Sequence, residues 1–261
     1  MTYTDLKKNT ITKRIYSLLD KGILYRRKDG KFKYRRTDQM AFNTPWIHIK
    51  STLNRKCDLW TLYVNHFNVI PEGCLNCWKI VARPKNFDEA VRFKNLMVGW
   101  NFPSKIGCEP RKFVPAHWGA YFYNDDMMEA ITKFQIIRKG MDEIDPNNSV
   151  ILKKGCSEFE QKYGDSRMWK GNPEFEKRLN DYFAWDFKVL HQPDEAIESV
   201  MMDWYEFAHS VGDMSYLPHN NGELLFPKPY VYYDGKPVPA PNPIPEPKKK
   251  VKKNVRSKKS S

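Results

Sequence analysis

Two cysteines stand three residues apart in the segment Cys74-Leu75-Asn76-Cys77, just before an apolar stretch that begins at Trp78. A Cys-x2-Cys turn presents two thiolates to one ion, and a tetrahedral zinc site needs four such ligands. Soft thiolates suit zinc or an iron–sulfur cluster better than they suit hard cations. The pair therefore predicts half of a metal site, and the other ligands have to come from elsewhere in the chain.

Three further cysteines are candidates for the two remaining ligand positions. We expect Cys108 and Cys156 to complete the site, with Cys57 as an alternative ligand. Zinc is the expected metal and an iron–sulfur cluster is the alternative. Two other interpretations stay open: these are small buried residues, since cysteine is among the most buried residue types, or Cys74 and Cys77 form a redox dithiol.

The chain shows no catalytic motif beside these cysteines. It contains no His-Glu-x-x-His, no Gly-x-Ser-x-Gly and no glycine-rich phosphate loop. Four thiolates would close the coordination shell of a metal and leave no position for a reacting water, so a structural role is expected. We assign no catalytic residue and favour a non-enzymatic protein over an enzyme with an iron–sulfur or redox cysteine site.

The elements that must position the cysteines alternate between strands and helices. The expected strands are residues 78–83, 105–113, 118–123 and 150–153. With a helix after the first and third strands, the order is β-α-β-β-α-β, which is that of the ferredoxin-like fold. Its strand order, 4-1-3-2, brings Cys74, Cys77, Cys108 and Cys156 to one end of the sheet. Cys108 would still lie roughly 10 Å away, two strand spacings, which keeps Cys57 as a rival.

Capping residues predict where the two core helices begin. Asn86, with Glu89 three residues later, is typical of a reciprocal helix cap. Asn124 or Asp125 is expected to cap the second helix. The apolar face of that helix is expected to comprise Met128, Ile131, Phe134, Ile137 and Met141.

The third strand, residues 118–123, is rich in aromatic side chains. It is loosely similar to the third strand of the RNA-recognition motif, although no Lys or Arg precedes Gly119 and the spacing differs by one residue. This resemblance makes Tyr121 and Tyr123 candidates for base stacking. Packing of these aromatics against residues 41–70 or 180–207 is the favoured interpretation, since those segments are rich in Trp and Phe.

The positive charge of the chain is concentrated at its two ends. The net charge is +13, of which residues 1–50 carry +9 and residues 248–261 carry +8, leaving about −4 for the rest. Nucleic acid, DNA or RNA, is therefore the expected partner, held by its phosphates and released by salt. The expected phosphate-binding residues are Arg26, Arg27, Lys28, Lys31, Lys33, Arg35, Arg36, Lys248, Lys249, Lys250, Lys252 and Lys253.

The N-terminal basic residues follow a predicted helix at residues 5–20 that ends at Gly22. Apolar and basic residues then alternate around Asp29-Gly30, which is typical of a β-hairpin. Over residues 10–37 this pattern resembles the recognition helix and wing of a winged-helix domain, which implies DNA binding. The alternative is a solvated hairpin packed on the body.

We expect an α+β protein with five segments. They are a basic helix plus β-hairpin at 1–40, a connecting segment at 41–73, a ferredoxin-like core at 74–156, a mostly helical extension at 157–236, and a proline-rich linker with a basic disordered tail at 237–261. The linker and tail resemble those of uncharacterised tailed-phage proteins. The resulting hypothesis is a metal-stabilised, nucleic-acid-binding or nucleoprotein-associated protein; a protein-interaction or viral structural protein with a solubilising tail is the alternative.

The sequence also bounds the compartment. No run of 18 apolar residues is present, so no membrane partner is expected, and the N-terminus lacks the apolar core of a signal peptide. We expect the cytoplasm, that of the host if the protein is phage-encoded, or a nuclear signal in the tail if it is eukaryotic. Five cysteines is an odd number, and disulfides are not expected in a reducing compartment.

Overall fold

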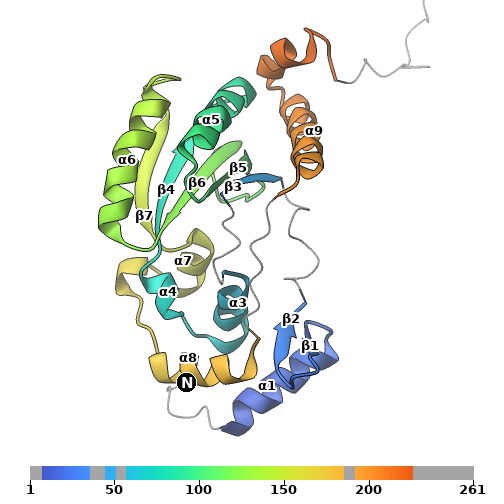
Figure 1. The fold of residues 1–261 in the computed structure, drawn as a ribbon, viewed down its shortest axis with the longest axis vertical. Helices are drawn as coiled ribbons and strands as arrows, with labels where there is room; N and C mark the ends of the chain where they lie inside the picture. The colour runs from blue at the N-terminus through green and yellow to red at the C-terminus, as the bar shows by residue number, and fades with distance from the viewer. Residues whose placement is uncertain (1–7, 36–44, 51–56, 185–191, 226–261) are drawn as a thin grey trace, which may run out of the picture. The chain divides into compact units, whose positions relative to one another are not determined.

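A computed structural model describes residues 8–35, 45–50, 57–184 and 192–225 (Figure 1). These residues belong to one compact unit, residues 1–225, whereas residues 226–261 form a second unit that lies outside the described residues. Arg36, the tail lysines at 248–253 and the linker therefore fall outside the description. Helices and strands are both abundant, which confirms the α+β class.

Five antiparallel strands form the central sheet, in the order β3-β5-β6-β4-β7. The strands are β3 (Trp46–Ile49), β4 (Trp78–Arg83), β5 (Ser104–Cys108), β6 (Trp118–Asn124) and β7 (Ser149–Lys154). The element order from β4 to β7 is the predicted β-α-β-β-α-β. Strand β3 departs from the expectation of a connecting segment at 41–73, because it adds an edge strand beside β5.

Three helices cover one face of the sheet: α5 (Phe87–Trp100), α6 (Met127–Asp142) and α9 (Asp194–Ser210) (Figure 1). Their apolar side chains and the inward residues of the strands form the main core. One half of the predicted reciprocal cap of α5 is present, since Asn86 Oδ1 accepts a hydrogen bond from the backbone N–H of Glu89 at 2.9 Å, whereas the Glu89 carboxylate accepts from the backbone N–H of Lys85. Helix α6 begins later than predicted and is capped by Asp126, because Asn124 is still paired in β6.

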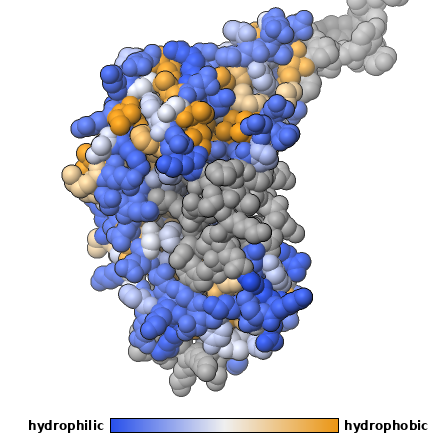
Figure 2. Space-filling view, viewed as in Figure 1, coloured by the Kyte–Doolittle hydropathy of each residue, from blue (hydrophilic) through white to orange (hydrophobic). Residues whose placement is uncertain are grey.

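The apolar face of α6 is only partly as predicted. Ile137 and Met141 are buried, but Met128 is 71% exposed because it lies in the first turn of the helix, beyond the sheet. Gly140 is buried instead, where a Cβ atom would lie 2.4 Å from the Trp100 ring. Exposed apolar residues of α5 and α6 contribute to the hydrophobic patches in the upper part of Figure 2.

The N-terminal helix and hairpin are present as predicted within the described residues. Helix α1 (Lys8–Asp20) ends at Gly22, whose φ of 65° is left-handed, and strands β1 (Leu24–Arg26) and β2 (Phe32–Tyr34) pair around the turn. The buried side of α1 packs in a second core with residues from the middle of the chain, including Leu179 and Phe183.

The remaining helices are short. They are α3 (Cys57–Leu62), continued by the π-helix η3 (Tyr63–Phe67), α4 (Glu72–Leu75), α7 (Ser157–Tyr163), η4 (Ser166–Met168), α8 (Pro173–Tyr182) and η5 (Met214–Asn220). Helices α4 and α7 lie at the end of the sheet where β4 begins and β7 ends (Figure 1). Helices α7, α8 and α9 lie within the segment at 157–236 that was predicted to be mostly helical. Within the described segments, no helix has the length and apolar character needed to cross a bilayer.

Candidate functional site on the open face of the sheet

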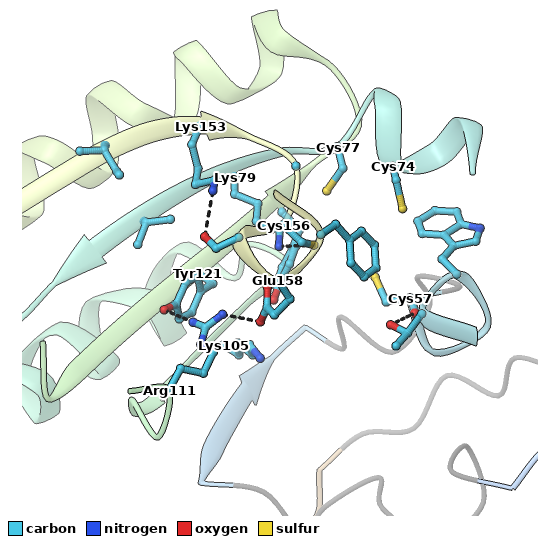
Figure 3. A pocket seen from close by; sticks show the side chains of 18 of the residues that line it. Cys57, Cys74, Cys77, Lys79, Lys105, Arg111, Tyr121, Lys153, Cys156 and Glu158 are labelled. Carbon is cyan, nitrogen blue, oxygen red and sulfur yellow. Dashed lines mark hydrogen bonds and ion pairs between the residues drawn. The ribbon is translucent and has the colours of Figure 1, made fainter. Parts of the chain in front are cut away.

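The face of the sheet opposite α5 and α6 carries charged and aromatic side chains. Strand alternation sends Ile80 and Ala82 into the core and leaves Lys79 and Arg83 on this open face. A cavity of about 530 Å³ opens over the face, bounded on its other side by α3 and α7 (Figure 3). The strand residues that line it are Lys79, Val81, Arg83, Lys105, Tyr121, Tyr123, Ile151 and Lys153.

Two of the lysines in the cavity have no carboxylate partner among the residues that the structure describes. Lys79 is 9% exposed; its ammonium donates a hydrogen bond to Cys156 Sγ at 2.7 Å and lies 5.3 Å from the centre of the Tyr123 ring. Lys105 is partly buried, and its ammonium lies over the Trp46 ring, 4.2 Å from its centre. Since no carboxylate pairs with either ammonium, the cavity has a local excess of positive charge. A buried charge is costly unless an anion compensates it.

The two lysines differ in their electrostatic surroundings. Burial, together with the neighbouring charges of Lys79 and Arg111, lowers the pKa of Lys105 to about 8. Burial alone would also lower the pKa of Lys79, but the sulfur of Cys156, with Tyr123 and Cys77, raises it well above its ordinary value. The Lys79 ammonium is therefore held in its charged form beside the Cys156 sulfur.

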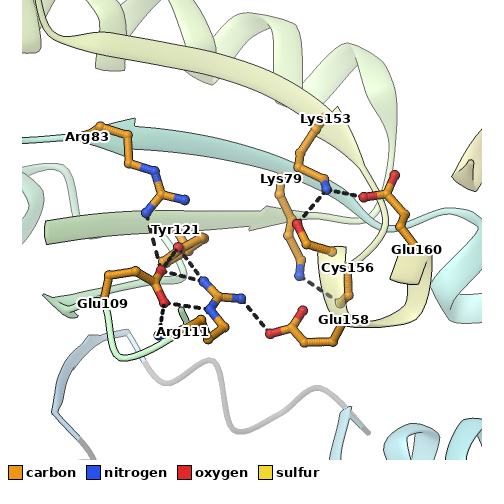
Figure 4. A network of polar contacts seen from close by, with 10 residues as sticks. Lys79, Arg83, Glu109, Arg111, Tyr121, Lys153, Cys156, Glu158 and Glu160 are labelled. Carbon is orange, nitrogen blue, oxygen red and sulfur yellow. Dashed lines mark hydrogen bonds and ion pairs between the residues drawn. The ribbon is translucent and has the colours of Figure 1, made fainter. Parts of the chain in front are cut away.

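The other cations of the cavity are held by acidic residues (Figure 4). Glu109, whose side chain is fully buried, accepts hydrogen bonds from Arg111 at 2.6 Å, from Arg83 at 3.3 Å and from the Tyr121 hydroxyl. Burial alone would raise the pKa of Glu109, but the hydrogen bonds from Arg111 and Tyr121 lower it to about 2. Arg111 also pairs with Glu158. This network fixes the guanidinium groups along one wall of the cavity.

Lys153 completes the cationic lining on the side of β7. Its ammonium donates to Ser157 Oγ at 2.9 Å and forms an ion pair with Glu160 of α7. Lys153, Arg83, Arg111 and Lys79 are thus held by protein partners, whereas Lys105 has no carboxylate at ion-pair distance among the described residues. The signal for these residues in the sequence was the alternation of basic residues within the predicted strands, as at Lys79 and Arg83.

Four of the five cysteines line the same cavity: Cys57, Cys74, Cys77 and Cys156 (Figure 3). Cys57 begins α3, Cys74 lies in α4, Cys77 immediately precedes β4 and Cys156 caps α7. Burial raises the pKa of the Cys74 thiol, and the sulfurs of Cys156, Cys57 and Cys77 raise it further. In the described part of the chain, no group of three or more His, Cys, Asp or Glu side chains is already arranged to hold a metal ion.

The fifth cysteine, Cys108, lies at the opposite end of the sheet. It is the last residue of β5 and pairs with Trp118, whereas Trp78, next to Cys77, pairs with Asn124 at the other end of β6. Its side chain is 5% exposed and belongs to the main core. Its expected grouping with the other cysteines is therefore wrong. Strand β5 was expected to continue to residue 113 but ends at Cys108, which places this cysteine at the far end of the sheet. Cys57, the alternative ligand, lines the cavity instead.

The aromatic residues of β6 pack as the sequence favoured. Tyr121 is 5% exposed, and its ring lies edge-on to Trp46 of β3, 5.5 Å between ring centres. On the other face, Trp118 packs edge-on against Trp204 of α9 at 5.3 Å. Packing against residues 41–70 and 180–207 is confirmed. Tyr121 and Tyr123 also line the cavity.

The basic residues of the N-terminal hairpin lie apart from this cavity and line none of it. Arg26, Lys28, Lys31 and Arg35 are exposed, whereas Arg27 and Lys33 are partly buried. Arg27 pairs with Asp29 in the turn at 3.2 Å. The described hairpin thus presents most of its predicted phosphate-binding residues to solvent.

Comparisons of the chain with protein-family models, with curated proteins and with solved structures found no match.

Proposed function

We propose that the protein binds nucleic acid and holds a single-stranded segment in the cavity on the open face of its sheet. The observation that carries the proposal is Lys105, which faces the cavity beside the Tyr121 ring and has no carboxylate at ion-pair distance among the described residues. Phosphates compensate such ammonium groups, and bases stack on aromatic rings in a manner that tolerates any sequence.

The topology supports this use of the sheet. The order β5-β6-β4-β7, with α5 and α6 on one face, is the arrangement expected of a ferredoxin-like core. The RNA-recognition motif likewise binds single strands on aromatic side chains of a four-stranded sheet. Tyr123 is the better candidate for stacking, since it is partly exposed in the cavity, whereas Tyr121 is committed to Trp46 and Glu109.

The exposed hairpin residues would add phosphate contacts outside the cavity. Arg26, Lys28, Lys31 and Arg35 share one short hairpin that follows the surface helix α1. Such contacts position a nucleic acid without reading its sequence. They favour binding along the backbone of DNA or RNA, and each one makes the affinity more dependent on salt.

The test is fluorescence anisotropy of the full-length protein with labelled single-stranded DNA, single-stranded RNA and duplex DNA, over a series of salt concentrations. Replacing Lys105 by Gln should weaken binding to single strands about tenfold and reduce the salt slope by about one, as expected for the loss of one phosphate contact. Tyr123→Leu should weaken binding by about 1–3 kcal/mol with little change in the salt slope, because stacking is not ionic.

The matched control is Lys139→Gln, which makes the same change on the exposed side of α6, far from the open face. It should leave binding nearly unchanged. An equal loss in Lys139→Gln and Lys105→Gln would contradict a role for the cavity, because it would mean that only net charge matters. If the protein binds only duplex DNA, and the double substitution Arg26→Gln with Lys28→Gln abolishes that binding, the hairpin is the nucleic-acid-binding surface instead of the cavity.

A further inference from the structure

Four cysteines that are distant in the sequence are brought to one cavity. Cys57 and Cys156 are separated by 99 positions, yet both line the cavity together with Cys74 and Cys77. The sulfurs of the four residues lie around the same end of that cavity in Figure 3. None of them forms a disulfide. A chain with five cysteines places four of them together, and the fifth, Cys108, stays in the core.

Close backbone contacts fix the segments that carry these cysteines. The backbone N–H of Gly155 donates to the carbonyl oxygen of Cys77 at 2.9 Å, which ties the end of β7 to the start of β4. Gly73 packs directly on the Trp60 ring, since a Cβ atom there would lie 2.3 Å from it. Because Trp60 belongs to α3 and Gly73 to α4, this contact holds the helix of Cys57 against the helix of Cys74.

A buried lysine lies beside the cysteines and donates a hydrogen bond to one of them. The ammonium of Lys79 is buried and donates to Cys156 Sγ, and within the described segments it has no carboxylate at ion-pair distance. Four thiolates around one divalent cation carry a net charge of −2, and their sulfurs still accept hydrogen bonds from neighbouring donors that do not bind the metal.

We infer that Cys57, Cys74, Cys77 and Cys156 form a tetrahedral zinc site at the end of the sheet, with Lys79 as a hydrogen-bond donor to the Cys156 sulfur. Zinc is bound by thiolates at ~2.3 Å, and four of them close its coordination shell. The sulfurs are not yet at those positions around a common point. Closing the site would therefore require the cysteine side chains to rotate, and a change of χ1 rotamer moves a cysteine sulfur by about 3 Å.

This site would stabilise the fold, since the metal would tie α3, α4, the start of β4 and the start of α7 to one another. Zinc binding releases protons from the thiols and adds its binding free energy to folding. The inference stands on the cysteines and Lys79 alone and does not depend on nucleic-acid binding, which Lys105 tests separately.

The first experiment measures the metal content of the full-length protein, purified under reducing conditions without chelators. The expected result is about one zinc per chain. Cys77→Ser and Cys156→Ser should each lose most of the zinc, whereas the matched control Cys108→Ala, which alters the cysteine outside the cavity, should keep it. A zinc-free protein, or equal loss of zinc in Cys108→Ala, would overturn the inference. Iron with acid-labile sulfide in place of zinc would also overturn it.

A second measurement uses the unaltered protein, in case the serine variants do not fold. A chelator is added, the thiols are alkylated, and the modified cysteines are identified by mass spectrometry. Removal of zinc should increase the alkylation of Cys57, Cys74, Cys77 and Cys156 together, and added zinc should protect all four, while Cys108 changes little. Addition of Co²⁺ should give the visible absorption of a tetrahedral thiolate complex. Alkylation that is indifferent to zinc, or a Cys74–Cys77 disulfide, would contradict the site.

Discussion

Lys105 gives the sharpest test of how the open face is built. The substitution Lys105→Gln removes an ammonium that lies over the Trp46 ring and has no carboxylate at ion-pair distance among the described residues. If the cavity holds uncompensated positive charge, this ammonium destabilises the protein when no ligand is bound. We therefore expect Lys105→Gln to increase the free energy of unfolding, although it weakens binding.

The magnitude follows from the pKa of Lys105, which is lowered from 10.5 to about 8 by burial and by neighbouring cations. A shift of this size corresponds to about 3 kcal/mol of destabilisation at neutral pH. Loss of the cation–π contact with Trp46 offsets about 1 kcal/mol of the gain. The net expectation is a stabilisation of about 2 kcal/mol at pH 7.

The sign of the pH dependence is also fixed. The folded state of the unaltered protein binds the proton of Lys105 more weakly than the unfolded state does, so its stability is reduced below pH 8 and recovers as the pH rises from about 8 toward 10.5. The advantage of Lys105→Gln should therefore be full at pH 7 and should fade above pH 8.

Urea denaturation followed by tryptophan fluorescence, at pH 7 and at pH 9.5, measures both quantities. Lys139→Gln on the exposed side of α6 is the control and should change stability by less than about 0.5 kcal/mol. If Lys105→Gln is less stable than the unaltered protein at pH 7, the lysine has a compensating partner and our account of the cavity is refuted.

The remaining predictions concern the carboxylate network of the cavity and two glycines. Glu109→Gln should lower the free energy of unfolding by about 3 kcal/mol at pH 7, because the carboxylate has a pKa of about 2 in the folded protein against an ordinary 4.5. This loss should shrink as the pH falls below 4.5. Glu158→Gln, at a half-exposed partner of the same network, should lower it by less than about 1 kcal/mol. Gly107→Ala would place a Cβ atom 1.9 Å from the backbone oxygen of Pro45 and should destabilise the protein by about 1–3 kcal/mol, measured by thermal unfolding. Gly99→Ala, in an open position of α5, should instead stabilise it by up to about 1 kcal/mol.

The local elements of this protein were largely readable from its sequence. Strand β4, the cap at Asn86 and the hairpin around Asp29-Gly30 were each predicted, because residues close in the sequence determine them. The element order from β4 to β7 followed from the same signals. Strand β3 was missed, since four residues, three of them buried, are too few to distinguish a strand from a connecting segment.

The tertiary structure decided which residues line the cavity. Cys57 and Cys156 meet because α3 and α7 pack at the same end of the sheet, a contact that no spacing in the sequence specifies. Cys108 was predicted near the start of a strand at 105–113, but it is the last residue of β5. The start and the end of a strand lie at opposite ends of the sheet, so the error in the strand's end put Cys108 at the wrong one.

The sequence by itself determined that a Cys-x2-Cys turn precedes a strand and that a basic hairpin follows the N-terminal helix. Only the tertiary structure decided which thiols share a cavity with Cys74 and Cys77, and that Lys79 and Lys105 face it without carboxylate partners among the described residues. The reason is physical: a residue's type and its local backbone are encoded nearby, but the charges and sulfurs around it come from strands and helices that are distant in the chain.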